Sequence, residues 1–356
     1  MGEVTIVDTF DNGAAAGTQT AERIRRVRVA AKQSSSKWLP VISRVQNLKR
    51  YGKALRQEIT AGPDSIIAFE PEAARIMLRS ARGPTKLLVH LHEIPTLDGY
   101  ADSRSGTVAL KYLLKNLGRA DAVVVPDVDR ADYLQELAGL KVKPLVVMNC
   151  PRRIPEMPNS LLIPFLRDRG IASTRIVHYQ GAVGVDHQLE AVIRSMRYWP
   201  EDAVFVIVGG GTKEYLTGLK ALTEAEGVGR RVIFAGRVPY DRLFQYTIGA
   251  SVGVTLLDPS VLNWRFSAGA SNKRFEYAAL GIPQVTNDGP GIQKLFAETG
   301  IAAIADHRDV ADVGKKISRF LLDEARCREV GARARQLHLQ SYNYEQQFQK
   351  ILELLI

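Results

Sequence analysis

The sequence alternates short apolar strands with helical segments, in two separate series. The first series has predicted strands at residues 65–69, 87–91, 122–125 and 145–148. The second has predicted strands at residues 175–179, 203–208, 231–234, 252–256 and 284–286. Alternation at this spacing predicts parallel sheets joined by right-handed crossovers. We therefore expect an α/β protein with two Rossmann-like domains.

The length of the chain fits this division. Its 356 residues are enough for two domains of ordinary size. Residues 151–170 are rich in proline and show no clear period, so the linker is placed there. The predicted borders are 1–158 for the first domain, 159–335 for the second and 336–356 for a last segment, whose residues 344–355 have an amphipathic helical pattern.

Composition and charge narrow the classes of partner. The chain is 46% hydrophobic and 24% charged, as globular proteins are, and its net charge of +10 favours anionic partners. No nucleic-acid recognition motif accompanies the charge, so nucleic acid is not expected. No signal peptide and no apolar run of roughly 20 residues is visible. The two cysteines, Cys150 and Cys327, lack metal-type spacing, which favours a cytoplasmic location.

Residues 41–59 predict an amphipathic helix with basic residues mostly away from its apolar face. Two interpretations stay open. The basic residues, Lys49, Arg50 and Lys53 among them, form either a solvated helix face or a surface that touches anionic lipids at the inner face of the plasma membrane.

Residues 263–290, NWRFSAGASNKRFEYAALGIPQVTNDGP, predict a loop, a helix, a turn and a buried strand. The helix is expected to begin near Asn272 and to end at Gly281. A helix N-terminus carries free N–H groups and a partial charge of roughly +0.5, which suits an anion, and Lys273 adds a cation. Glu276, one turn later, can accept hydrogen bonds from hydroxyls. Phosphate donors beside a carboxylate for a sugar diol predict a nucleotide-sugar site.

Ligands of open parallel sheets lie beyond the carboxyl ends of the strands, so the residues after each strand of the second series are candidates. Glycines there let the backbone approach a ligand. The candidates for donor binding are Gly181, Gly184, Gly209, Gly210, Arg237, Val238, Asn263, Ser271, Asn272 and Glu276.

The segment NKRFEYAALGIPQVTNDGPG resembles the donor-site segment of the GT-B-fold retaining glycosyltransferases of family four, the glycosyl transferases group 1. The family pattern runs roughly P-x-K-x-F-E-Y-x-A-x-G-x-P-V-V, and the resemblance covers about residues 175–295, including VIVGGG, RVIFAGRVPYDRL and ASVGVTLL. It implies two parallel-sheet domains that face each other across a cleft, with the last helix crossing back to the first domain.

The resemblance also implies roles. The substrate would be a nucleotide sugar, UDP- or GDP-linked, with no cofactor. Arg237 and Val238 would lie near the base, Glu276 would accept the ribose hydroxyls, and the diphosphate would meet the helix end at 272–273 and the loop 181–184.

Two departures from the family pattern affect the site. Many members carry a glutamate eight positions before the second one, where this chain has Ala268. Many also carry Arg and Lys after the first strand, where this chain has Gly181-Ala182 and, approximately, His187. We therefore expect Arg265 and Lys273 to meet the phosphate charge, with His187 as a further candidate.

In the first domain, His90 and His92 point to one side of a strand because strand side chains alternate. A metal site would need a third ligand, and none has recognisable spacing. The family pattern D-x-H-E matches His92-Glu93, which implies that His92 positions the donor or shares a proton with an acceptor hydroxyl. The alternative is a structural histidine at the strand end. Glu70 matches an acidic strand-end position more weakly.

Asp127-Val128-Asp129 spells the metal motif of the other glycosyltransferase fold, but it stands between a strand and a helix. We expect the aspartates to begin the helix, and we expect activity without metal. Residues 2–7 resemble the family's later G-x-x-V-T-V strand, so the first βα unit is expected to be absent or replaced.

These observations together predict a bacterial glycosyltransferase that transfers a sugar with retention to a cell-envelope or exopolysaccharide precursor, a saccharide or lipid-linked acceptor. The expected catalytic residues are His92, Lys273 and Arg265. Two alternatives stay open: a non-catalytic nucleotide-sugar-binding or scaffold subunit of a transferase complex, motivated by Ala268, and a GT-B-like nucleotide-sugar epimerase.

Overall fold

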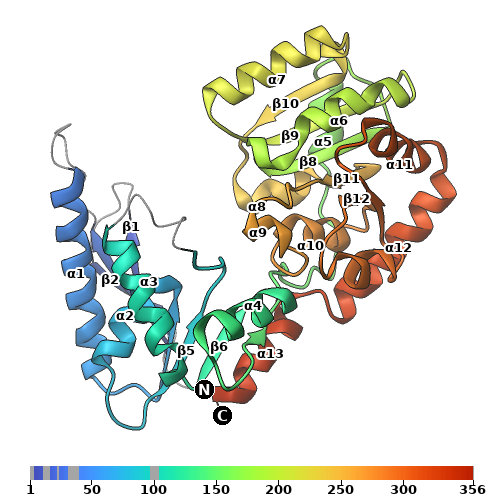
Figure 1. Cartoon of the computed structure of the whole chain (residues 1–356). Helices are drawn as coiled ribbons and strands as arrows, with labels where there is room; N and C mark the ends of the chain where they lie inside the picture. The colour runs from blue at the N-terminus through green and yellow to red at the C-terminus, as the bar shows by residue number, and fades with distance from the viewer. Residues whose placement is uncertain (1–3, 11–16, 22–23, 31–39, 97–103, 356) are drawn as a thin grey trace. The chain divides into compact units, whose positions relative to one another are not determined.

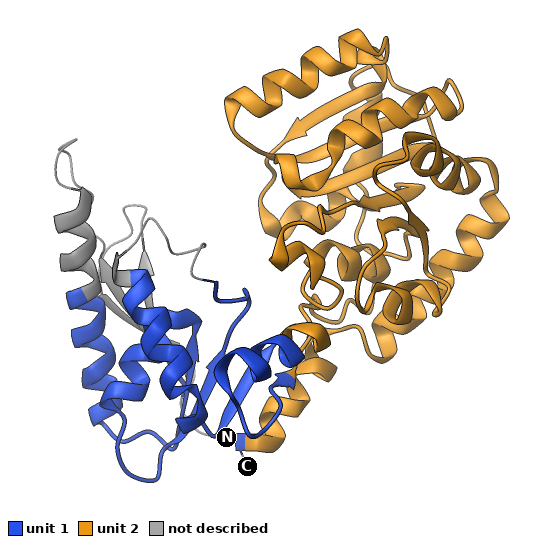
Figure 2. Ribbon diagram, in the orientation of Figure 1, with its two compact units in different colours: residues 1–125, 131–145, 355 blue, residues 126–130, 146–354, 356 orange. Residues whose placement is uncertain are grey.

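The computed structural model describes residues 4–10, 17–21, 24–30, 40–96 and 104–355. They fall into two compact units (Figures 1 and 2). Unit 1 comprises residues 1–125, 131–145 and 355, and unit 2 comprises residues 126–130, 146–354 and 356.

Unit 1 contains two sheets. In the first sheet, of order β1-β3-β2, β1 pairs in parallel with β3 and β2 pairs antiparallel with it. Its strands are β1 (Val4–Phe10), β2 (Gly17–Ala21) and β3 (Ile24–Ala30). The second sheet has the order β4-β5-β6-β7, with β5 parallel to β4 and to β6. Its strands are β4 (Ser65–Phe69), β5 (Lys86–His90), β6 (Ala122–Val125) and β7 (Leu145–Val146).

Helices of unit 1 follow the predicted alternation. They are α1 (Pro40–Thr60), α2 (Glu70–Ser80), α3 (Arg104–Asn116) and α4 (Val128–Ala138), whose first residues belong to unit 2. The predicted helix at 41–59 is confirmed as α1. Strand β3 was not predicted, because its arginines hide the alternation in the sequence IRRVRVA. The predicted strand at 145–148 is shorter and ends at Val146.

Unit 2 is built on one six-stranded parallel sheet of order β10-β9-β8-β11-β12-β13. The strands are β8 (Ile176–Ala182), β9 (Val204–Gly210), β10 (Val232–Gly236), β11 (Val252–Thr255), β12 (Gln284–Asn287) and β13 (Ala302–Ala305). The strand order reverses between β8 and β11, and ligands of doubly wound sheets bind at the carboxyl ends beside such a reversal.

The helices of unit 2 connect these strands. They are α5 (Leu162–Arg167), α6 (Leu189–Ser195), α7 (Lys213–Ala225), α8 (Tyr240–Leu243), α9 (Leu262–Arg265), α10 (Asn272–Ala279), α11 (Val310–Leu322), α12 (Glu324–Gln340) and α13 (Tyr344–Leu355). The core includes Val177, Phe205, Val254 and Ile317, which come from β8, β9, β11 and α11. Two α/β units with parallel sheets confirm the predicted fold class.

Three details of unit 2 correct the sequence prediction. Gly181, Gly209 and Gly210 lie in the last residues of strands, not in loops, and Gly181 pairs with Gly209. A Cβ atom on Gly209 would collide with the carbonyl oxygen of Gly181, so glycine allows the strands to continue side by side. The helical pattern of residues 308–333 predicts one helix, but the structure has two, separated at Asp323, whose carboxylate accepts from Arg326 N at 2.9 Å. Strand β13 was not predicted.

The borders of the compact units differ from the predicted 158 and 335, since unit 2 comprises residues 126–130 and 146–354 and so includes nearly all of α13. The expectations that the last segment crosses to the first domain, and that the two domains face each other across a cleft, stay predictions. In the part of the chain that the structure describes, no helix is long and apolar enough to span a membrane.

Candidate functional site

Helix α10 carries the central residues of the predicted site. It begins at Asn272, as predicted, with Ser271 as the preceding residue, and every residue from Lys273 to Ala279 is buried. A short helix buried on all sides brings its charged side chains into the protein interior. Buried charges need partners, so the surroundings of Lys273, Arg274 and Glu276 decide what this helix can do.

The Lys273 ammonium lies among aromatic groups. Nζ donates to the Tyr179 hydroxyl at 3.4 Å, lies 3.5 Å from His187 Nδ1 and sits 4.7 Å from the centre of the Tyr179 ring. Among the described residues, no ion pair to Lys273 is found. Burial, and next the Arg274 charge, lower the pKa of Lys273 to about 7. This ammonium is therefore a desolvated cation that an anion would stabilise.

Gly181 makes room for this lysine. Its φ of +117° lies in the region that favours glycine, and an added Cβ would stand 3.3 Å from Lys273 Cε. His187 also lies beside the ammonium, next to Trp264 with ring centres 5.3 Å apart. Burial, and then the charge of Lys273, lower the pKa of His187 to about 3, so this imidazole is neutral.

Glu276 is held by neutral donors. Its Oε2 accepts from Gln180 Nε2 at 2.5 Å, and its Oε1 accepts from the Tyr240 hydroxyl at 3.4 Å. Gln180 is fixed in turn by Thr247, whose Oγ1 donates to Gln180 Oε1 at 2.5 Å. Burial is the main influence on the carboxyl and raises the pKa of Glu276. A carboxylate held in this way can accept further hydrogen bonds from ligand hydroxyls.

Arg274 connects the segments around the helix. Its side chain is fully buried; Nη1 donates to Ser267 O at 2.8 Å, Nε to Thr286 Oγ1 at 3.0 Å and Nη2 to Asn287 Oδ1 at 3.4 Å. The same Asn287 oxygen accepts from Leu257 N at 2.9 Å. Burial lowers the pKa of Arg274 to about 9, and Asp127 opposes this shift. The guanidinium thus ties α10 to β12 and to the loops after β11.

Residues 126–130 hold the loop before α10. Asp127 Oδ2 accepts from Gly269 N at 2.7 Å, and Arg130 donates to Phe266 O at 2.6 Å and to Asn263 O at 2.8 Å. Asp127 Oδ1 also accepts from Asp129 N at 2.9 Å, the helix-start contact expected at α4. Among the described residues, no cluster of three or more metal-ligating side chains is present.

Several predicted site residues lie apart from Lys273. Arg265 is exposed and donates to Pro259 O at 3.1 Å, and Asn272 is exposed at the start of α10. Arg237 is exposed and runs along Gly210, where a Cβ would collide with it. Val238 packs against the core that contains Val206. The structure brings together Gly181, Lys273, Glu276 and the candidate His187, but it shows no contact that adds Arg265 to them.

In unit 1, the strand ends carry a second group. His90 and His92 have ring centres 4.4 Å apart, as the strand alternation predicted, and Phe69 stacks on His92 at 5.8 Å. The Glu70 carboxylate accepts from His92 N at 2.8 Å. Burial, then His92, lower the pKa of His90 to about 4. His90 is thus a buried neutral ring, whereas His92 is partly exposed at the end of β5.

Sequence reasoning missed the residues that complete the surroundings of Lys273 and Glu276. They are Tyr179, Gln180, Tyr240, Thr247 and Trp264. Tyr179 ends a predicted strand that is typical of ordinary core, and Gln180 follows that strand directly. Their position immediately before Gly181, near the end of β8, was the only available signal.

Known proteins resemble this chain in sequence over one segment and in fold over nearly its whole length. Residues 188–353, which contain α10, match the sequence family described as "Glycosyl transferase-like". No match is found among curated proteins.

Solved structures show the same fold at low identity. Sucrose-phosphate synthase from Thermosynechococcus elongatus has a TM-score of 0.76 at 17% identity, covering 99% of this chain and 88% of that chain. HepE from Anabaena, in complex with UDP and glucose, has a TM-score of 0.70 at 13% identity, covering 100% and 99%. WaaG, a glycosyltransferase involved in lipopolysaccharide biosynthesis, has a TM-score of 0.65 at 13% identity, covering 95% and 88%.

These similarities confirm the resemblance to GT-B glycosyltransferases, while membership of the retaining family four stays a prediction. Residues 188–353 thus match the glycosyl transferase-like family, and the whole chain has the GT-B fold.

Proposed function

We propose that this protein transfers a sugar from a nucleotide-sugar donor, UDP- or GDP-linked, to a saccharide or lipid-linked saccharide of a cell-envelope or exopolysaccharide pathway in the bacterial cytoplasm. The observation that carries the proposal is that α10 holds a buried cation, which forms no ion pair among the described residues, one turn from a buried carboxylate. They lie beside Gly181, at the carboxyl end of β8.

Each group has a distinct part in the proposed reaction. The Lys273 ammonium binds the diphosphate and stabilises the charge that develops on it as the glycosidic bond breaks. Glu276 accepts the ribose hydroxyls and fixes the nucleotide. Arg265 adds a cation from the end of α9, and His92 of unit 1 positions the sugar or exchanges a proton with the acceptor hydroxyl. The proposed transfer retains the anomeric configuration and needs no metal ion.

The ligands bound in two similar structures indicate which nucleotide sugars to test first. HepE is solved with UDP-glucose, and a trehalose-6-phosphate protein from E. coli is solved with UDP-2-fluoro glucose. The test is calorimetric binding of UDP-glucose, UDP-N-acetylglucosamine, UDP-galactose and GDP-mannose, followed by donor hydrolysis with and without chelator. Saturable binding and chelator-resistant hydrolysis of one donor are expected. If none of the four nucleotide sugars binds, the proposed donor class is wrong. If chelator abolishes hydrolysis, the proposed metal-independent reaction is wrong.

One observation favours a second candidate, a non-catalytic nucleotide-sugar-binding subunit. Ala268 occupies the position of the family's first glutamate and is buried in an apolar cluster with Phe275 and Phe296, so no carboxylate is offered there. This candidate predicts donor binding without hydrolysis or transfer. An epimerase would instead convert the donor into another free nucleotide sugar, which chromatography of the reaction products would detect.

Helix α1 is the proposed contact with anionic membrane. Lys49, Arg50 and Lys53 are exposed on it, whereas Gly52 and Ile59 are buried. We expect charge reversal of the three basic residues to weaken sedimentation with phosphatidylglycerol vesicles. Reversal of the exposed Lys111, Lys115 and Arg119 serves as the charge-matched control, and equal binding by both triple variants would contradict the membrane contact.

A further inference from the structure

A second region of unit 2 has the chemistry of a binding site and shares no residue with the surroundings of Lys273. It is a hollow of about 380 Å³ lined by residues of α11, of α12 and of the start of β13. This volume falls within the range of roughly 300–1,000 Å³ that is usual for small-molecule sites. The apolar residues that line it include Phe320, Val330 and Ala303.

The rim of the hollow is cationic. Four basic side chains line it, against the single carboxylate of Glu329; they are Lys316, Arg319, Arg326 and Arg333. Arg333 Nη2 lies 3.0 Å from Glu329 Oε1, and Lys316 Nζ lies 4.0 Å from Asp312 Oδ1. Within the described residues, the guanidinium groups of Arg319 and Arg326 meet no carboxylate and no hydrogen-bond acceptor. Two guanidinium groups are therefore left without a counter-charge.

A neighbouring hollow of about 510 Å³ extends the cationic surface. Arg319 and Arg326 line both hollows, and Lys315 joins them on the second side. The carboxylate of this second hollow, Asp323, is engaged in capping α12 through Arg326 N. The shared arginines stand between two spaces, where a ligand can reach them from either side.

Gly300 contributes to the shape of the first hollow. Its φ of +71° suits glycine, and a Cβ there would collide with the Arg333 guanidinium. A glycine at this position lets Arg333 lie close to the backbone at the start of β13 while its side chain reaches Glu329. The cationic rim is thus partly fixed before any ligand binds, which reduces the ordering cost of binding.

We propose that this hollow binds a small phosphate-bearing molecule, and that the Arg319 and Arg326 guanidinium groups donate hydrogen bonds to the phosphate. The planar guanidinium matches phosphate oxygens in bidentate geometry. The uncharged part of the molecule packs against the apolar residues around Phe320. The phosphate is either free in solution or the headgroup of an anionic lipid, and both sources offer the same oxygens to the two arginines.

The test uses Arg319→Gln/Arg326→Gln and the charge-matched control Lys213→Gln/Arg328→Gln, which removes two exposed cations outside both hollows. Both are made in a Lys273→Met background, so that the predicted donor site does not contribute. Inorganic pyrophosphate is titrated by calorimetry at fixed ionic strength. The arginine variant should bind at least about 10-fold more weakly, and the control should bind as the Lys273→Met parent does.

A second arm separates the two sources of phosphate. Vesicles of phosphatidylglycerol are sedimented with each variant. If only the arginine variant loses vesicle binding, the ligand is a lipid headgroup. If that variant keeps vesicle binding but binds pyrophosphate more weakly, the ligand is a free phosphate. Unfolding midpoints should match among the variants, because the two arginines have no partner to lose. Equal pyrophosphate affinity in the two double variants, whether weakened or intact, would overturn the proposal.

Discussion

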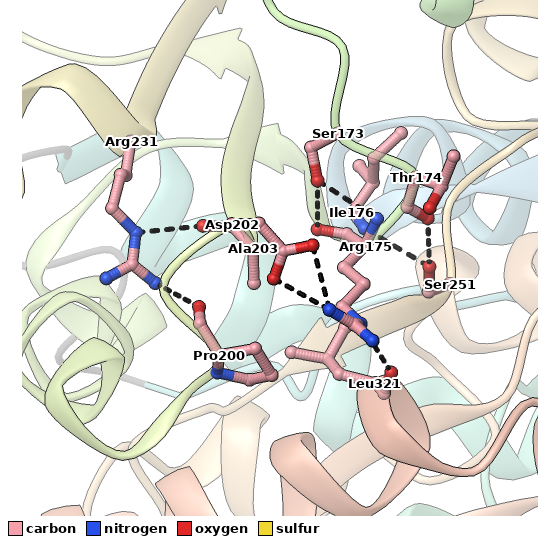
Figure 3. A network of polar contacts seen from close by, with 10 residues as sticks. All are labelled: Ser173, Thr174, Arg175, Ile176, Pro200, Asp202, Ala203, Arg231, Ser251 and Leu321. Carbon is pink, nitrogen blue, oxygen red and sulfur yellow. Dashed lines mark hydrogen bonds and ion pairs between the residues drawn. The ribbon is translucent and has the colours of Figure 1, made fainter.

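Charged side chains have different surroundings at the two ends of the unit 2 sheet. At the amino end, charged side chains meet complementary partners (Figure 3). Arg175 Nη1 lies 2.8 Å from both oxygens of Asp202, and Arg231 donates to Ala203 O at 2.9 Å and to Pro200 O at 2.8 Å. At the carboxyl end, Lys273 and Glu276 are almost fully buried, and each is surrounded chiefly by neutral groups.

The difference separates stability from function. Arg175 also donates to Leu321 O at 3.2 Å, so the amino-end contacts join the starts of β8 and β9 to the end of α11. They stabilise the domain and leave nothing for a ligand. The carboxyl end keeps a cation whose pKa falls to about 7 and a carboxylate whose pKa is raised. Burying such groups costs stability, and groups of this kind gather at functional sites.

The largest effect is expected for Lys273→Met. Turnover should fall about 100- to 1,000-fold, as on removal of one charge-stabilising group, because the diphosphate loses its buried cation. The free energy of unfolding should not fall, because the substitution removes a desolvated ammonium that forms no ion pair among the described residues. Turnover and urea unfolding measured on the same preparation check both parts. A variant that turns over normally, or that unfolds more easily, would contradict the proposed role.

Arg274→Met should weaken the fold more than any other substitution at the carboxyl end. It removes the donor to Ser267, Thr286 and Asn287 and leaves these acceptors buried, at a cost of about 3 kcal/mol. Urea unfolding checks this value. If the midpoint matched the unsubstituted protein, the guanidinium would not be what holds these loops.

Glu276→Gln should lower the affinity for UDP about 10-fold, since hydrogen bonds to a charged acceptor are worth about 1.5 kcal/mol or more. The matched control is a ligand, 2′,3′-dideoxy-UDP, which lacks the ribose hydroxyls. Its affinity should be the same for the protein with and without the substitution. A loss of equal size for both nucleotides would show that Glu276 does not hold the ribose.

Arg175→Met should have the smallest effect. The ion pair with Asp202 is about half-exposed, with 40% and 54% of the two side chains accessible, so it contributes about 1 kcal/mol at most. Unfolding should shift by that amount while donor hydrolysis stays unchanged. Loss of turnover in Arg175→Met would contradict the claim that the amino-end contacts serve stability alone.

The sequence predicted the local elements well and the distant contacts poorly. Helix α10 begins at Asn272 and stops before Gly281, and α13 spans 344–355, because caps, glycine and helical period are local signals. The contact of Gln180 with Glu276 joins residues 96 positions apart, and no local pattern reveals it. Arg274 stands in a charged-looking stretch and is nevertheless fully buried, because its partners come from β12 and from the preceding loop. Strand β13 carries only four small or branched residues, too few for a period.

The proton balance of Lys273 connects the site to pH. Its usual pKa is 10.5 and its pKa in the folded protein is about 7. Between these values the unfolded chain holds a proton that the folded chain has released. The free energy of unfolding therefore rises as the pH is raised from 7 to 10.5, and it is lowest below pH 7. Bound diphosphate favours the charged ammonium and reverses the shift.

The most direct test is calorimetric titration of UDP at pH 8 in two buffers of different ionisation enthalpy. The neutral Lys273 must take up a proton when diphosphate binds, so the protein should show an uptake approaching one proton, and Lys273→Met should show none. Affinity should also fall as the pH rises above 7. Tight UDP binding without proton uptake, unchanged in Lys273→Met, would show that the diphosphate does not bind at this ammonium.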